Sequence, residues 1–337
     1  MREERGMPEA VFESLGLIGN TLILLVSILA LDKSSDLTID NSVKVAEITG
    51  LGKTTIGFLL IAFSTSLPEL SVSIFSIVDP EAIGVTIGNV LGSNIANVCL
   101  ILGLCFLIVS LKSNAGEYNF SNVTTEEIRN LYFGLFIASL IPLALIYIGY
   151  ASNIIGAILI TIFIFHNIQS IRSGKNKEAY ASRKGGGAVK KYTLLALLGV
   201  AGVVASAYFI VESASYIAEE LGVPRVVIGA TIVAFGTSLP ELVTSVDATR
   251  KGHIELALGN IIGSGFVNIT LILGVVLLGG SFKVVMSAYS NLVIFSIMAN
   301  LLLWYFLSGE RMSWREGLIL LFVYALFIAT SFGAYQS

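Results

Sequence analysis

The sequence has little charge and few residues of the kinds that build disulfides or thiolate metal sites. Charged residues make up 13% of its 337 residues, about half of the roughly 25% found in soluble domains. The two histidines, His166 and His253, are far apart in the sequence. Cys99 and Cys105 are six residues apart and on different faces of a helix, so the spacing predicts neither a disulfide nor a metal site. The small net charge of −3 gives no indication of a nucleic-acid partner.

Long apolar runs dominate the chain. The mean hydropathy is +0.86 and 55% of the residues are hydrophobic, which is typical of an integral membrane protein. Because one helical crossing needs about 20 apolar residues, we expect an all-α polytopic membrane protein with ten transmembrane helices. The predicted spans lie near 13–31, 54–78, 83–110, 130–149, 151–168, 192–217, 225–248, 254–278, 284–307 and 313–333. The first is expected to be a retained helix rather than a cleaved signal peptide, because no small-residue cleavage site follows it.

A glycine-rich basic stretch separates the first five spans from the last five. Residues 171–191 contain seven Lys and Arg residues up to Lys191, and the positive-inside rule places such a loop in the cytoplasm. The basic loops 249–253 and 308–315 then also lie inside. With an even number of spans, both termini lie outside. The loop at 111–129 should be inside although it is acidic, because acidic residues contribute little to orientation.

Two stretches of the chain repeat. IGFLLIAFSTSLPELSVS at 56–73 aligns with IGATIVAFGTSLPELVTS at 228–245, and IGNVLGSNIANVCLILG at 87–103 aligns with LGNIIGSGFVNITLILG at 258–274. Each pair occupies the second and third spans of its half. Since five spans is an odd number, the second half should be inverted relative to the first. Inverted repeats with broken helices at matching places are typical of transporters with a binding site at the bilayer midplane.

The repeat defines the expected domain organisation. Residues 1–170 form the first five-helix repeat, with its motif at about 56–103; residues 171–191 form the linker; and residues 192–337 form the second repeat, with its motif at about 228–274.

The first motif places a carboxylate at membrane depth in each half. Glu69 and Glu241 are costly there, and such residues usually face the bundle interior and have a function. Pro68 and Pro240 precede them and remove the hydrogen bond to a carbonyl four residues earlier. Such carbonyls need other partners within the membrane. The Thr-Ser pairs of both motifs can converge with the carboxylates on one helical face; they are Thr65, Ser66, Thr237 and Ser238.

The second motif supplies neutral polar groups. Ser93 and Asn97 are four residues apart on one helical face, and so are Ser264 and Asn268. Their recurrence favours a ligand role over a simple interhelical hydrogen bond. Glycines at four-residue spacing allow helices to approach closely, and we expect them to bring this face against the Glu-bearing helix; they are Gly88, Gly92, Gly259 and Gly263.

All of these groups are oxygen donors. Two carboxylates with neutral oxygens suit Ca²⁺, which takes six to eight oxygen ligands, and disfavour Zn²⁺ or copper, which prefer nitrogen and sulfur. Na⁺ would accept the same donors. The charge of two carboxylates can be balanced by one Ca²⁺, two Na⁺ or two protons, so the composition of the site leaves the exchanged ions open.

The doubled TSLPEL, together with GNxxGSNxxN, resembles the α-repeats of the sodium/calcium exchangers, within the cation/Ca²⁺ exchanger superfamily. The ten-span layout with a cytoplasmic central loop is similar to the prokaryotic members. The resemblance implies a monomeric antiporter with alternating access, in which entering Na⁺ drives Ca²⁺ out, with no cofactor other than the transported ions. The ion ligands that it implies are Glu69, Glu241, Asn97, Asn268, Ser66, Ser238, Thr65, Thr237, Ser93 and Ser264, and the carbonyls of Ala62 and Ala234.

Three positions depart from the family pattern. Ser64 stands where the motif has Gly, as in Gly236, and Gly265 replaces the Asn found at Asn94. Asn268 stands where several relatives, including the potassium-dependent ones, carry Asp. An Asn holds neither charge nor proton, so this position counts against K⁺ co-transport but leaves H⁺ open as the driving ion.

Other functions remain to be separated by experiment. The nearest alternative is a H⁺-driven antiporter of Ca²⁺ or another divalent cation. An ion channel would conduct without a counter-ion. A membrane-embedded enzyme is disfavoured, because the motifs contain neither a His/Cys cluster nor a nucleophile–base pair.

Overall fold

The computed structural model describes residues 7–70, 73, 83–112, 117–119, 123–173, 186–222, 234–279, 282–283, 286–309 and 311–333. This part of the chain is almost entirely helical, with four short strands. Eight of its helices are long and apolar enough to cross a membrane. The prediction of an all-helical, multi-pass membrane protein is therefore confirmed.

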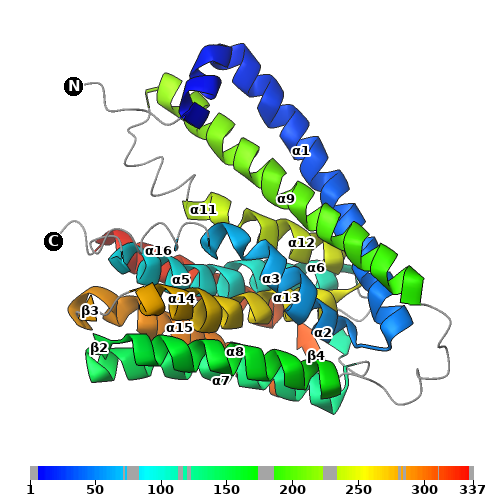
Figure 1. Ribbon diagram of the computed structural model, residues 1–337, viewed down its shortest axis with the longest axis vertical. Coiled ribbons are helices and arrows are strands. Elements are labelled where there is room, and N and C mark those ends of the chain that lie inside the picture. Colours follow the sequence, from blue (N-terminus) through cyan, green and yellow to red (C-terminus); the bar gives the residue numbers. More distant parts are fainter. Residues whose placement is uncertain are drawn as a thin grey trace.

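The elements follow one another along the chain as a series of antiparallel helices (Figure 1). Their bounds are α1 (Met7–Thr49), α2 (Lys53–Ile56), η1 (Gly57–Ile61), α3 (Ala62–Thr65), α5 (Ile83–Ile95), η2 (Ala96–Leu102), α6 (Gly103–Lys112), β1 (Glu117–Asn119), α7 (Thr125–Ile148), β2 (Tyr150–Ala151), α8 (Asn153–Ser173), α9 (Gly186–Glu220), α11 (Ala234–Thr237), α12 (Leu239–Arg250), α13 (Ile254–Val267), η5 (Asn268–Ile272), α14 (Leu273–Gly279), β3 (Phe282–Lys283), α15 (Met286–Ser308), β4 (Arg311–Ser313) and α16 (Trp314–Gly333). The three η segments are short π-helical stretches inside longer helices.

Two of the ten expected spans are not continuous long helices in the described residues. The span expected at 54–78 consists of α2, η1, α3 and a further helical piece at 67–70, and most of the rest of it lies outside the described residues. The span expected at 225–248 is described only from residue 234, as α11 and α12. These two spans carry the TSLPEL motifs, where proline removes a backbone donor and where the repeated pattern predicts broken helices.

Helices α1 and α9 form a pair that lies inclined across the other helices (Figure 1). Both are longer than the spans expected at 13–31 and 192–217, because polar helical turns continue the apolar ones. Close packing explains the extension of α1: a Cβ at Gly199 would lie 2.5 Å from Thr38 Oγ1, and one at Gly202 would lie 2.4 Å from Ser34 Oγ. Gly16, with φ of 61°, interrupts α1 near its start.

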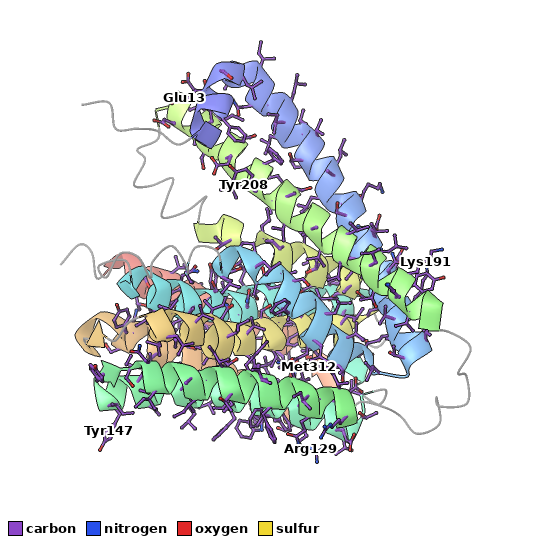
Figure 2. All side chains as sticks on the ribbon, in the orientation of Figure 1. Glu13, Arg129, Tyr147, Lys191, Tyr208 and Met312 are labelled. Atoms are coloured by element: carbon purple, nitrogen blue, oxygen red, sulfur yellow. The ribbon has the colours of Figure 1, made fainter. Side chains whose placement is uncertain are left out.

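At the end of the pair near Gly16, aromatic rings join the two helices. The ring of Phe12 lies 6.4 Å from that of Tyr208 and 6.3 Å from that of Phe209. Tyr208 and Glu13 mark this end in Figure 2, whereas Lys191 marks the other end of α9.

The helix from Ile254 to Gly279 occupies the centre of the remaining bundle. All fourteen residues of α13 are buried. It packs against α2, η1 and α3 of the first half, against α7 and against α12. In Figure 1, α13 and α14 run between the α7–α8 layer and the layer that contains α3, α5 and α12.

Two small antiparallel sheets tie loops together at opposite ends of the bundle. Strand β1 pairs with β4, so the loops at 111–129 and 308–315 lie together. Strand β2 pairs with β3 at the other end. Arg129 and Tyr147 mark the two ends of α7 (Figure 2). Loops that the predicted up-and-down order assigns to one side are therefore neighbours in the structure.

Candidate cation-binding site

The two TSLPEL motifs break their helices at equivalent residues. Helix α3 ends at Thr65, and Ser66 has φ of −82° and ψ of 6° before the helix resumes at 67–70. Helix α11 ends at Thr237, and Ser238 has φ of −92° and ψ of 5° before α12 begins. A proline has no N–H for the carbonyl four residues earlier, so each motif carries the same local interruption of the backbone ladder.

The second motifs contain an irregularity that no sequence pattern had indicated. The π-helical stretch η2 begins at Ala96, next to Asn97, and η5 begins at Asn268 itself. Short π-helical insertions in α-helices occur frequently at functional sites. Both stretches contain a residue that is predicted to contribute an amide oxygen, Asn97 in η2 and Asn268 in η5.

Nearly all of the predicted ligand side chains are buried. Thr65, Ser66, Glu69, Ser93, Asn97, Ser238, Glu241, Ser264, Asn268 and the methyl group of Ala62 are each at most 6% exposed. Thr237 is partly buried. Ala234 begins α11, and its side chain lies outside the described residues.

The carboxylate of Glu241 contacts residues from both halves of the chain. Its Oε1 lies 3.4 Å from the hydroxyl of Ser66 and 3.5 Å from that of Ser264. Thr65 also interacts with this carboxylate. Glu69 is close enough to Glu241 for the two carboxylates to interact electrostatically. The structure therefore brings together residues of both first motifs and of the second motif of the second half.

Several buried polar atoms of the predicted ligands have no hydrogen-bond partner among the described residues. They are both carboxylate oxygens of Glu69, Oε2 of Glu241, and the oxygen and nitrogen of the Asn97 and Asn268 amides. Leaving such groups unpaired costs about 1–3 kcal/mol each, and more when they are charged. Their presence on predicted ligands of all four motif copies fits a site that binds a cation, since carboxylate and amide oxygens are the donors that hard cations prefer.

Two glycines of α13 allow the central helix to touch the first motif. A Cβ at Gly259 would lie 2.1 Å from the carbonyl oxygen of Thr54, and a Cβ at Gly263 would lie 2.7 Å from the Cβ of Ala62. The expectation that glycines bring the Ser/Asn face against the Glu-bearing helix is met for this pair. No described atom lies within 4 Å of a Cβ at Gly88 or Gly92.

The difference between Ser64 and Gly236 has a local cause. The hydroxyl of Ser64 donates to the carbonyl of Leu60 at 2.8 Å, so it is satisfied within its own helix. At Gly236, a Cβ would lie 2.0 Å from Cγ2 of Val211 on α9. The second motif therefore packs tightly against α9 at this position.

Asn94 and Gly265 face each other across the two halves. A Cβ at Gly265 would lie 2.6 Å from the amide oxygen of Asn94. The amide nitrogen of Asn94 donates to Ser296 at 2.7 Å and lies 3.4 Å from the oxygen of Asn300. The Asn300 amide in turn donates to Ser139. Asn94 thus fills the space in front of Gly265, which accounts for glycine at that position.

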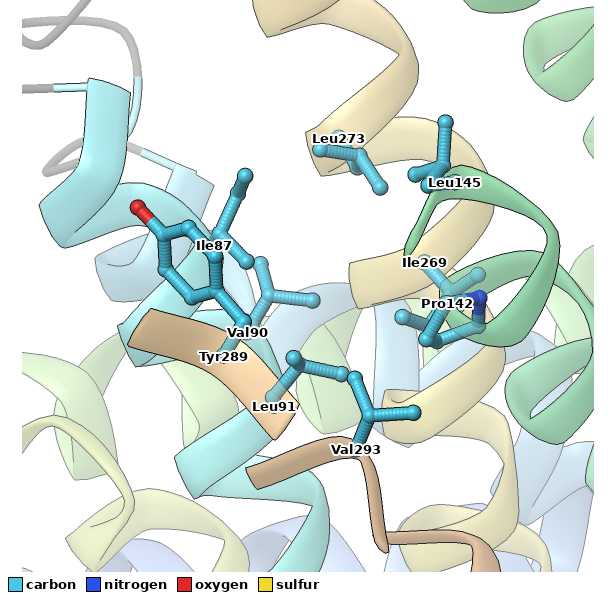
Figure 3. A pocket seen from close by; sticks show the side chains of 9 residues that line it. All are labelled: Ile87, Val90, Leu91, Pro142, Leu145, Ile269, Leu273, Tyr289 and Val293. Atoms are coloured by element: carbon cyan, nitrogen blue, oxygen red, sulfur yellow. The ribbon is translucent and has the colours of Figure 1, made fainter. Parts of the chain in front are cut away.

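An apolar cavity near the second motifs is not a candidate site for an ion. Ile87, Leu91, Pro142, Ile269 and Tyr289 are among its lining residues (Figure 3). Its volume is about 20 Å³, which is room for roughly one water molecule. A cation there would meet almost no oxygen ligands.

Comparison with known proteins decides the family. The sequence model of the family described as "Sodium/calcium exchanger protein" matches residues 19–171 and 191–333. This chain belongs to that family. The resemblance inferred from the doubled motifs is therefore confirmed.

Similar proteins match nearly the whole chain. The sodium/calcium exchanger MaX1 of Methanosarcina acetivorans is 33% identical, covering 93% of this chain and 98% of its own. The uncharacterized membrane protein MJ0091 of Methanocaldococcus jannaschii is 31% identical, covering 91% and 96%. The solved structure of the sodium-calcium exchanger NCX_Mj soaked with zero Na⁺ and Ca²⁺ matches with a TM-score of 0.80 at 29% identity, covering 93% of this chain and 99% of that chain.

Sequence reasoning missed a polar group that touches the exchanger motifs. Asn260 is buried and forms hydrogen bonds with Thr65, Thr244 and Ser245. The aligned repeats offered an indication, because Asn260 of LGNIIGSG occupies the place of Asn89 in IGNVLGSN. Its partners could not be read from the sequence, since Thr65 is 195 residues away.

Proposed function

We propose that this member of the sodium/calcium exchanger family is a secondary active antiporter that exchanges Na⁺ for Ca²⁺ by alternating access. One observation supports this most directly. Glu69, Glu241, Asn97 and Asn268, which come from both repeated motifs of both halves, each have a buried oxygen with no hydrogen-bond partner among the described residues. Two carboxylates among neutral oxygens can be balanced by one Ca²⁺ or by two Na⁺, so the site can exchange one for the other without being left as bare charge in the membrane.

The proposed ligands divide into two kinds. Glu69 and Glu241 supply the charge. Neutral oxygens come from the amides of Asn97 and Asn268, the hydroxyls of Thr65, Ser66, Ser93, Thr237, Ser238 and Ser264, and the carbonyls of Ala62 and Ala234. Because Asn268 cannot ionise, the site has two titratable groups among these ligands, which disfavours K⁺ as a third transported ion.

The proposed topology is ten crossings in two inverted five-helix repeats, residues 1–170 and 192–337, with broken helices at the midplane. The equivalent breaks at Ser66 and Ser238 support it. So does the pairing of β1 with β4 and of β2 with β3, since each pair joins loops of the same predicted side. We place the 171–191 linker in the cytoplasm and both termini outside, and we expect a monomer.

Alternating access needs one group of helices that can shift against another. Helices α1 and α9 pack mainly on each other and meet the remaining bundle at α2, α3, α11 and α12. These contacts lie beside the two broken helices that carry the ligands. We propose that rearrangement of the α1–α9 pair against the bundle opens the site to either side in turn.

Ca²⁺ uptake into proteoliposomes tests the transport function. With Na⁺ loaded inside, an outward Na⁺ gradient is expected to drive Ca²⁺ uptake. A pH gradient without Na⁺ should not. If only the pH gradient drives uptake, the protein is a H⁺-driven antiporter of Ca²⁺ or another divalent cation, and if Ca²⁺ flux is independent of any counter-ion, it is a channel.

The same assay tests the carboxylates. Glu69→Gln and Glu241→Gln are each expected to lower exchange at least about 100-fold, because losing one charged ligand costs more than the roughly 3 kcal/mol of a charged hydrogen bond. The control is Glu126→Gln, the same substitution on a half-exposed side chain at the start of α7. Exchange at the wild-type rate in either test variant would remove that residue from the site.

A further inference from the structure

Asn260 joins three helices at the edge of the proposed site. It lies on α13, is 1% exposed, and belongs to none of the predicted ligands. Its side-chain oxygen accepts a hydrogen bond from Thr65 Oγ1 on α3 at 3.2 Å. Its amide nitrogen donates to Thr244 Oγ1 at 3.1 Å and to Ser245 Oγ at 2.9 Å, both on α12.

The orientation of this amide follows from its neighbours. Thr244 Oγ1 lies 2.7 Å from the carbonyl oxygen of Pro240, and a hydroxyl has a single hydrogen to donate. Once that hydrogen is directed at Pro240, Thr244 can only accept from Asn260. The NH₂ group of Asn260 must therefore face α12, and its oxygen must face Thr65.

Thr65 is surrounded by more acceptors than it can serve. Its hydroxyl oxygen lies 3.1 Å from the carbonyl of Ile61, 3.3 Å from that of Ala62 and 3.2 Å from the amide oxygen of Asn260. It also interacts with the carboxylate of Glu241. One hydrogen is shared among these oxygens. If it points to Asn260, the lone pairs of the hydroxyl are free for a cation beside Glu241.

We propose that Asn260 is a positioning residue for cation binding. By accepting the hydrogen of Thr65, it turns the lone pairs of that hydroxyl toward the site. Its bonds to Thr244 and Ser245 hold the amide in the orientation that this requires. This inference rests on the proposed function, because it assigns to Asn260 a role in binding the transported ions.

A double-mutant comparison separates this role from simple packing. Asn260→Ala and Thr65→Val are each expected to raise the half-saturating Ca²⁺ concentration of Na⁺-driven uptake about tenfold, the effect of one buried hydrogen bond. The maximal rate should stay within about twofold. If Asn260 acts through Thr65, the double variant should be no more than about twofold worse than Thr65→Val alone.

Two further variants serve as an alternative to Asn260→Ala and as a control. Asn260→Leu keeps the volume of the side chain and removes its hydrogen bonds, so it replaces Asn260→Ala if the smaller residue prevents folding. Asn300→Ala is the matched control, because Asn300 is equally buried but its bonds go to Ser139 and Asn94. The Asn300→Ala variant should have the half-saturating Ca²⁺ concentration of the wild type, even if its thermal stability is lower.

Each outcome has a clear meaning. The positioning role is wrong if the effects of Asn260→Ala and Thr65→Val multiply in the double variant. It is also wrong if the half-saturating Ca²⁺ concentration is unchanged in Asn260→Ala and Asn260→Leu. Neither result contradicts the exchange function. A wild-type protein that neither takes up Ca²⁺ nor is thermally stabilised by it overturns both. A coupled rise confined to the Asn260 and Thr65 variants supports the inference.

Discussion

The central helix and the first helix are nearly equal in hydropathy but differ sharply in their surroundings. In the most apolar stretch of the Ile254–Gly279 helix, 83% of the residues are buried, against 17% in that of α1. The central helix carries glycines and polar residues where it meets other helices, whereas α1 presents leucine and isoleucine to its surroundings. Apolar character therefore shows that a segment enters the membrane, and small and polar residues show which segment lies at the centre.

A large effect on both stability and transport is expected from adding one methyl group to the central helix. In Gly259→Ala the new Cβ would lie 2.1 Å from a backbone oxygen of Thr54, so α13 must move away from the first motif. Overpacking typically costs about 1–3 kcal/mol, and movement here also displaces Asn260 and Ser264. We expect a marked loss of thermal stability in detergent and at least about a tenfold loss of Na⁺-driven Ca²⁺ uptake.

Gly187→Ala is the matched control for this prediction. Gly187 is exposed near the start of α9, and no described atom lies within 4 Å of its Cβ position. Alanine is favoured over glycine in a helix by about 1 kcal/mol, so this variant should be as stable as the wild type or more so. Equal behaviour of the two variants would contradict the close packing of α13 on α2.

A smaller effect is expected where charges connect α1 to the bundle. Nζ of Lys251, just after α12, lies 2.7 Å from Asp36 and 2.9 Å from Asp40 on α1, and 3.4 Å from Asp247. Lys251→Met should cost about 1 kcal/mol of stability, because the group is partly exposed and screened. The loss should shrink as salt is raised, and Lys251→Arg should largely preserve stability. A loss that salt does not alter would contradict an electrostatic link.

The pH dependence of this link has a definite sign. Partial burial alone would lower the pKa of Lys251, but hydrogen bonds to Asp36 and Asp40 and the charge of Asp247 outweigh it and raise the pKa above its ordinary value. A group with a raised pKa contributes fully below its unfolded pKa of about 10.4 and loses the contribution only as the pH rises through its folded value. The difference between wild type and Lys251→Met should therefore be flat from about pH 6 to about pH 9.

The sequence predicted the candidate site best where a charged residue interrupts an apolar segment. Glu69 and Glu241 stand out because a carboxylate within an apolar run is visible without any knowledge of the fold. Residues 32–49 were not expected to extend the first helix, because a hydropathy pattern ends at Asp32 and Lys33, and the packing that sustains α1 depends on Gly199 and Gly202, far along the chain. Asn260 was missed for the same reason: its role follows from partners on two other helices.

The smallest effect is expected on the outer face of α1. Ile18, Leu22, Val26 and Leu29 recur at helical spacing and are exposed, as expected for a face that contacts lipid. Leu22→Ala and Leu29→Ala should change stability and exchange by less than about 0.5 kcal/mol, because lipid is as apolar as the side chain that is removed. Ile39→Ala on the same helix is the control: that residue is fully buried, and its truncation should cost about 2–5 kcal/mol. If the outer-face variants were as unstable as Ile39→Ala and the mass of the purified protein in detergent fell, that face would be a protein–protein interface, and the expectation of a monomer would be wrong.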